Sequence, residues 1–105
     1  MRKRCAAKWR VIEAFRQYAV ISPWGERAVS DNEREIMERV LDQLSPAEKT
    51  AVQNVYMLAP KEYINSEKIR YRVKRTAYET FYSESNVYRM LKRARELYEK
   101  EREQG

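Results

Sequence analysis

The sequence contains very little glycine, proline and cysteine. Two glycines and three prolines among 105 residues leave few positions for the tight turns that join β-strands. Helix-favouring residues such as Glu, Arg, Lys, Ala and Leu are abundant instead. The only cysteine, Cys5, excludes a disulfide within one chain and a zinc site built from several thiolates. The composition therefore predicts a small all-α domain in a reducing, cytoplasmic setting.

Two further absences bear on activity and location. The chain has no histidine and no glycine-rich phosphate loop, and no nucleophile stands beside a recognisable base. We therefore expect no enzyme activity, no cofactor and no metal site. No long apolar run is present either, since charged residues interrupt even the segment 9–13. Neither a signal peptide nor a membrane span is expected.

Positive charge is the main surplus. The net charge is +6 and the isoelectric point is near 9.5, which suits a polyanionic partner such as double-stranded DNA. The alternative is that the charged helical surface is only solvated and binds no polyanion. The basic residues are concentrated late in the chain, whereas residues 26–48 are rich in acids. The concentrated set is Arg70, Arg72, Lys74, Arg75, Arg89, Lys92, Arg93 and Arg95.

Helical spacing of apolar residues, together with capping residues, predicts five helices. They lie near residues 5–21, 31–44, 46–59, 67–81 and 84–101. Capping boxes at Ser30 with Glu33 and at Ser45 with Glu48 begin the second and third helices, and Asn65 or Ser66 begins the fourth. Residues 61–66 form a polar connection without a clear signal.

The chain divides, if at all, at residues 22–30. Residues 1–29 would form an N-terminal helix and linker, and residues 30–105 the main domain. The first helix offers more apolar surface than a lone helix needs, at Trp9, Val11, Ile12 and Phe15. This surplus predicts self-association into a homodimer.

The last two helices are expected to meet at a tight corner. Ser83 can cap a helix that begins near Glu84, while the small residues Thr76 and Ala77 allow the preceding helix to cross closely. The buried stripe of the last helix is Val87, Met90, Leu91, Ala94, Leu97 and Tyr98. The stripe of the fourth helix is Ile69, Val73, Thr76, Ala77 and Phe81. The arrangement is typical of a helix-turn-helix, which places a polar helix face in the major groove.

The run from Leu44 to about Tyr98 resembles region 4 of bacterial sigma factors, and most of all phage late-gene regulators of the RinA/ArpU type. The similar segments are Leu-Ser-Pro-Ala-Glu-Lys from residue 44 and Ser-Glu-Ser-Asn-Val-Tyr-Arg-Met-Leu-Lys-Arg-Ala from residue 83. The chain departs from that pattern at Phe81, where glycine is common, and at Thr80, where leucine is common. The resemblance implies that helix 84–98 reads a promoter element, in a regulator that acts near RNA polymerase.

Within that helix, Asn86 and Arg89 are the leading candidates for contacts with bases. Arginine pairs with guanine and asparagine with adenine, and the two positions share one helix face. Ser85 is a further base-contact candidate, which could equally touch a phosphate. The phosphate-contact candidates are Arg72, Lys74, Arg75, Lys92 and Arg93. The alternative for all of these residues is ordinary solvation on an exposed helix.

The many tyrosines could instead indicate stacking on single-stranded nucleic acid. Tyr56, Tyr78, Tyr82 and Tyr98 lie close to the apolar stripes, however, so burial in the core is expected for them. Three functions remain open. The first is a sequence-specific DNA-binding transcriptional regulator of phage or prophage origin. The second is a small phage protein that inhibits a host defence complex, such as a CRISPR nuclease, by binding protein. The third is a DNA-packaging adaptor of small-terminase type.

Overall fold

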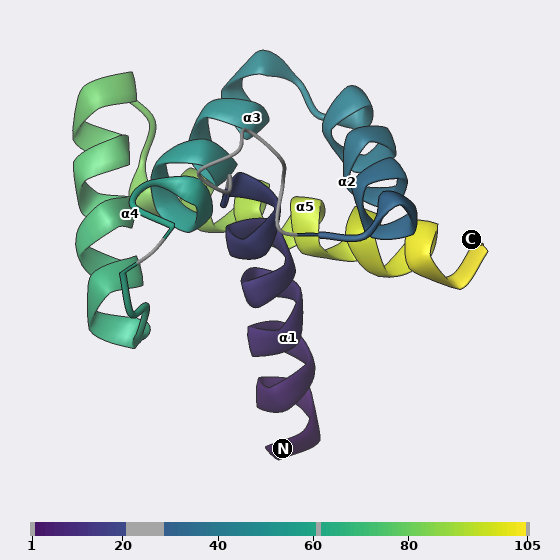
Figure 1. Ribbon diagram of the computed structural model, residues 1–105. Helices are drawn as coiled ribbons and strands as arrows, with labels where there is room; N and C mark the ends of the chain where they lie inside the picture. The colour runs from purple at the N-terminus through teal and green to yellow at the C-terminus, as the bar shows by residue number, and fades with distance from the viewer. Residues whose placement is uncertain (1, 21–28, 61, 105) are drawn as a thin grey trace.

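The computed structural model describes residues 2–20, 29–60 and 62–104, with side chains from Lys8 onward. Throughout this part of the chain the regular structure is helical, without a strand (Figure 1). The elements are α1 (Arg2–Ala19), α2 (Asp31–Gln43), α3 (Pro46–Val52), a π-helical turn η1 (Gln53–Met57), α4 (Ser66–Thr80) and α5 (Glu84–Gln104). The predicted all-α fold is confirmed. Among the described helices, none has the length and apolar character needed to cross a bilayer.

Helix α5 is the central element of the fold. It packs against α1, α2, α3 and α4. In Figure 1, α5 runs across the molecule, with α4 at one end and α2 near the other, while α1 leads down to the N-terminus. The helix predicted to read DNA is thus also the helix on which the rest of the fold assembles.

Side-chain caps begin the helices where the sequence predicts them. Ser45 and Glu48 form a complete capping box, in which Glu48 Oε1 accepts the Ser45 N–H at 2.8 Å and Ser45 Oγ accepts the Glu48 N–H at 3.2 Å. Ser30 makes the forward half of its box, accepting from Glu33 N at 3.2 Å. Asn65, rather than Ser66, caps α4 by accepting from Lys68 N at 2.9 Å. Each cap satisfies a backbone donor that the first helical turn leaves unpaired.

Some boundaries differ from the prediction. Helix α1 ends at Ala19, and Ile21, the predicted end of the first helix, lies outside the described residues. Helix α5 continues to Gln104, three residues beyond the predicted end. Contacts with α2 account for this extension, because Glu101 accepts hydrogen bonds from Arg39 (3.1 Å) and Gln43 (2.9 Å).

The third predicted helix runs through α3 and η1 and ends at Met57. After Val52 the backbone widens into η1, and the chain turns at Ala59, whose φ is 52°. Leu58, which lies within the predicted third helix, is consequently about half exposed. Arg16 of α1 holds the following segment by donating to the carbonyl oxygens of Pro60 and Glu62, the latter at 3.1 Å.

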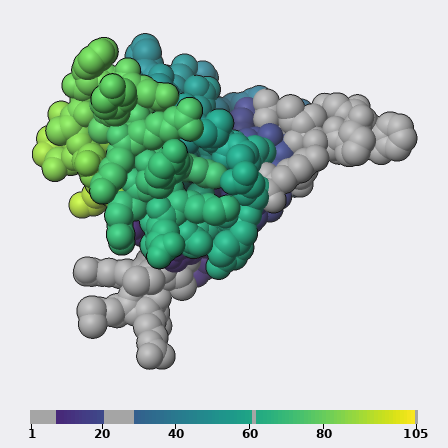
Figure 2. Space-filling view, turned by 90° about the vertical axis from the view of Figure 1, so that its left-hand side faces the viewer, coloured from purple at the N-terminus to yellow at the C-terminus, as the bar shows by residue number. Residues whose placement is uncertain are grey.

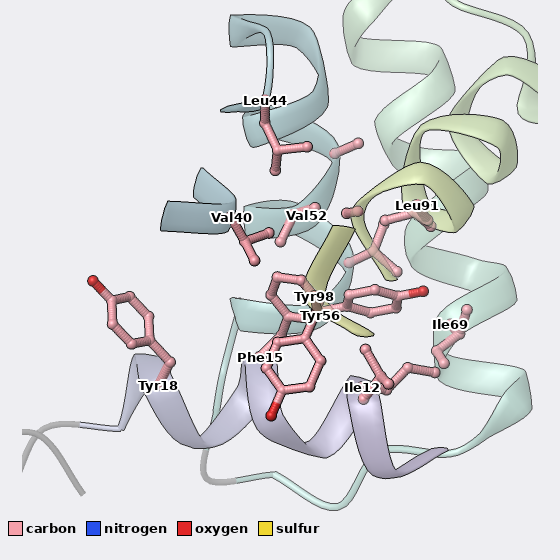
Figure 3. Close-up of a cluster of buried hydrophobic side chains, with 14 of the residues drawn as sticks. Ile12, Phe15, Tyr18, Val40, Leu44, Val52, Tyr56, Ile69, Leu91 and Tyr98 are labelled. Atoms are coloured by element: carbon pink, nitrogen blue, oxygen red, sulfur yellow. The ribbon is translucent and has the colours of Figure 1, made fainter. Parts of the chain in front are cut away.

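Aromatic rings form the centre of the core (Figure 3). The ring of Phe15 lies 5.7 Å from that of Tyr56 and 5.9 Å from that of Tyr98, measured between centroids. Both tyrosines keep a polar partner, since Tyr98 donates to Glu33 at 2.9 Å and Arg95 donates to Tyr56 at 2.7 Å. Burial raises the pKa of both hydroxyls above the ordinary value.

The apolar side chains of α1 belong to this same core. Val11, Ile12 and Phe15 are at most 4% exposed, and Trp9 packs against the core from its edge. These are the residues whose surplus apolar surface suggested self-association. The chain buries three of the four itself, so they supply no argument for a dimer.

Three aromatic residues expected in the core lie on the surface. Tyr78 is 85% exposed, Phe81 96% and Tyr82 44%. Tyr78 follows Val73 by five residues, which turns it to the far side of α4 from the buried stripe. Phe81 adopts the left-handed conformation that ends α4, and Tyr82 belongs to the turn, so neither continues the stripe.

Candidate nucleic-acid interface

Helices α4 and α5 meet at a three-residue turn. Phe81 ends α4 with φ 63° and ψ 17°, a left-handed conformation that is usually taken by glycine. Ser83 then begins α5, because its Oγ accepts the N–H of Asn86 at 3.1 Å and its carbonyl accepts that of Val87 at 3.0 Å. The side chains of Thr76 and Ala77, at 2% and 8% exposure, are buried on α4 before the turn. The predicted cap and the predicted small residues are both found at this corner.

The inner side of α5 carries the predicted stripe. Val87, Leu91, Ala94 and Tyr98 are buried, and Met90 and Leu97 pack against the core as partly buried residues. The opposite side is exposed, which leaves it free to contact a ligand. It carries Ser85, Asn86, Arg89, Lys92 and Arg93. We refer to these five residues as the α5 face.

Within the α5 face, the two leading base-contact candidates lie together. Arg89 Nη1 donates to Asn86 Oδ1 at 3.3 Å, a long hydrogen bond between two exposed side chains. Such a bond is easily exchanged for a contact with a base edge. Ser85 lies one turn before Arg89 on the outer side, and Lys92 follows it on the same side.

Arg93 differs from its neighbour Lys92. Arg93 Nη1 donates to Glu48 Oε1 at 2.9 Å, which ties α5 to the start of α3. Lys92 is exposed and has no ion-pair partner within the described part of the chain. Glu48, Tyr82, Asn86, Arg89, Met90 and Arg93 line a hollow of about 220 Å³ beside the α5 face. Of the two residues on α5 that are predicted to contact phosphates, only Lys92 has no ion-pair partner among the described residues.

Arg72 is not a surface residue, and its place among the predicted phosphate contacts is corrected here. It is 8% exposed, and its Nη1 donates to the carbonyl of Val55 in η1 at 3.0 Å. Its Nη2 donates to Glu62 at 3.4 Å. The guanidinium therefore holds η1 and the following segment against α4. A buried cation engaged in this way cannot reach a phosphate on a bound duplex.

The other predicted phosphate contacts on α4 are exposed. Lys74 has no ion-pair partner among the described residues, and Arg75 makes only a 3.4 Å pair with Glu79, four residues on. Such an exposed pair contributes little to stability, so Arg75 can exchange it for another anion.

The surface of α4 also carries aromatic residues that are not among the predicted site residues. Tyr71 and Tyr78 are 64% and 85% exposed, and Phe81 follows at the turn. The sequence indicates this exposure, because Tyr71 and Tyr78 fall outside the apolar stripe that contains Ile69 and Val73. Figure 2 views the molecule onto α4, whose side chains, in green, cover much of this face.

Charge is separated across the molecule. Basic residues outnumber acidic ones at the exposed positions of α4 and the first half of α5, where the basic set is Arg70, Lys74, Arg75, Arg89, Lys92 and Arg93 and the acidic set is Glu67, Glu79 and Glu84. Acidic residues are in excess on α2, which exposes Asp31, Glu35, Glu38 and Asp42 against Arg34 and Arg39. In Figure 1, α4 and α2 lie at opposite sides of the fold. This distribution favours the approach of a polyanion from the α4–α5 side over the α2 side.

Comparisons with known proteins add no information on this interface. No family model, no curated protein and no solved structure matches the chain.

Proposed function

We propose that the chain is a sequence-specific DNA-binding protein that regulates transcription, as the resemblance to phage regulators implies. The observation that carries the proposal is the α5 face. An exposed basic and amide-bearing helix surface begins directly after a tight, capped turn from α4. Helices of this kind enter the major groove with the residues of their first turns toward the base edges.

Each part of the interface has a distinct task in this proposal. Asn86 and Arg89 contact base edges, because an amide and a guanidinium each match a two-point pattern on adenine and guanine. Ser85 contacts a base or a phosphate at the start of the helix. Lys92, with Lys74 and Arg75 from α4, contacts phosphates and sets the position of the domain on the duplex. Arg72 contacts no DNA in this proposal, and its role is to hold η1 against α4.

The proposal is tested by selecting binding sites from a random DNA library and measuring the binding of the enriched site at several salt concentrations. We expect an enriched motif and an affinity that falls steeply with salt, since each phosphate contact releases counterions. No enrichment, with tight binding to a host protein complex, would support the inhibitor instead. Ring-sized particles in sedimentation would support the packaging adaptor.

A further inference from the structure

A second surface, separate from the α5 face, lies on the outer side of α4. It consists of Arg70, Tyr71, Lys74, Arg75 and Tyr78, and Phe81 extends it at the turn. We refer to these six residues as the α4 face. The three aromatic rings are 64%, 85% and 96% exposed, in chain order. Large aromatic side chains exposed to this extent are a sign of a binding surface, because their burial would otherwise stabilise the fold.

Two cations of the α4 face lie between its two tyrosines. Tyr71 and Tyr78 are seven residues apart, so they project from the same side of the helix about 10.5 Å apart along its axis. Lys74 and Arg75 lie between them. Arg70 and Lys74 have no ion-pair partner among the described residues, and Arg75 has only its long pair with Glu79.

The end of the α4 face is hollowed. Ala77, Tyr78, Glu79, Phe81, Tyr82 and Ser83 line an open hollow of about 600 Å³ around the turn. Three of these six side chains are aromatic, and Ala77 presents a small apolar surface. A space of this size, bordered by aromatic rings, admits a flat heterocycle.

We propose that the α4 face binds a segment of single-stranded nucleic acid. Unpaired bases stack on Tyr71, Tyr78 and Phe81, and the phosphates between them meet Arg70, Lys74 and Arg75. Proteins that bind single strands combine aromatic rings with a basic track in this way, because every base offers a flat face and every linkage a negative charge. The positive charge of the α4 face complements that backbone.

The spacing favours a nucleic acid over an acidic protein as the occupant. A protein docking site concentrates its anchors in one desolvated cluster, with a polar rim. On α4, Tyr78, Phe81 and Tyr82 gather around one hollow, but Tyr71 lies about 10.5 Å from Tyr78 along the helix axis, with Lys74 and Arg75 between them. A polymer in which flat rings alternate with negative charges matches this pattern along its length.

The proposal does not depend on duplex recognition by the α5 face. Lys74 and Arg75 are shared with the proposed duplex contacts, but Tyr71 and Tyr78 are not, so the tyrosine variants test single-strand binding alone. The test measures fluorescence anisotropy of labelled oligothymidylate and oligouridylate of about twenty nucleotides, longer than the ~4–16-nucleotide sites typical of single-strand binders. The preferred oligonucleotide identifies DNA or RNA as the source of the strand. A labelled polyglutamate chain serves as the acidic protein surrogate.

We expect Tyr71→Ala and Tyr78→Ala each to weaken single-strand binding about tenfold, as loss of one stacked base does. Tyr63→Ala is the matched control, since Tyr63 is 77% exposed but precedes α4. Arg89→Ala should leave single-strand binding unchanged. All four side chains are exposed, so circular dichroism should confirm intact folding.

Three results would overturn the proposal. The first is single-strand binding that the two tyrosine variants leave unchanged, even if Lys74→Gln weakens it, because stacking would then be absent. The second is an equal loss in the Tyr63 control. The third is binding of polyglutamate as tight as that of the oligonucleotides, which would identify the α4 face as a docking surface for an acidic protein.

Discussion

Arg93 and Glu48 are joined by a 2.9 Å ion pair across 45 residues of sequence. The oxygen that accepts from Arg93, Glu48 Oε1, also accepts the N–H of Ser45 in the capping box of α3. One carboxylate therefore begins α3 and holds a cation of the α5 face. In the proposed DNA complex, Glu48 competes with a phosphate for Arg93 and adds a negative charge beside the interface.

Glu48→Gln should strengthen DNA binding. Glutamine can still take part in a capping box, so α3 should form normally. Arg93 loses its counter-charge and becomes available to a phosphate. We expect tighter binding to random duplex and a log–log salt dependence steeper by about 0.9 for the added phosphate contact. Titrations at several salt concentrations measure both quantities, and an unchanged slope would show that Arg93 does not reach the DNA backbone.

Arg89→Ala and Lys92→Ala should separate recognition of bases from attraction to phosphates. Arg89→Ala should cost ~1–3 kcal/mol on the selected site and have little effect on random DNA, because a base contact is lost. Lys92→Ala should weaken both kinds of DNA similarly and lower the salt slope by about one. Alanine favours helices and both positions are exposed, so the fold should survive. If both variants bind the selected site like the parent, α5 does not read DNA.

Arg72→Met should destabilise the fold. The carbonyl of Val55 loses its buried partner, and an unpaired buried acceptor costs about 1–3 kcal/mol. Arg70→Met is the matched control on the same helix, because Arg70 is exposed and should change the free energy of unfolding by less than ~0.5 kcal/mol. Urea denaturation compares the two. Equal effects would mean that the contact between Arg72 and η1 contributes nothing measurable.

Phe81→Gly should stabilise the fold. Glycine adopts the left-handed conformation at the end of α4 without the steric cost that Phe81 bears, which we expect to raise the free energy of unfolding by roughly 0.5–1 kcal/mol. Phe81→Ala removes the same exposed ring but keeps a Cβ, so it should leave stability nearly unchanged. Thermal unfolding of both variants separates the effect of the backbone conformation on stability from the effect of losing the ring. A glycine variant no more stable than the alanine variant would contradict the expectation.

Local patterns account for the features that the sequence could predict. The caps at Ser45, Asn65 and Ser83 depend on residues within one turn, and the stripe of α5 on spacing within one helix. Such features require no knowledge of what packs nearby. They were enough to predict five helices and the exposed α5 face.

The remaining features depend on contacts between distant segments. Arg72 is buried because η1 packs over it, and neither the π-helical turn nor its position is visible in the spacing of residues 46–59. The pair of Arg93 with Glu48 likewise joins two separate helices. The position of Tyr78, unlike those of Arg72 and Arg93, does not depend on a distant segment. Tyr78 lies close to apolar residues in the sequence, but the helical period places it on the outer side of α4.

The central position of α5 has a consequence for the evolution of the sequence. Its inner residues contact every other α-helix, so substitutions there disturb the whole domain. The outward positions 85, 86, 89 and 92 alternate with them along the same helix and support no other element. New ligand preferences can therefore arise by a few substitutions at these positions, while selection for folding acts on their neighbours in the sequence.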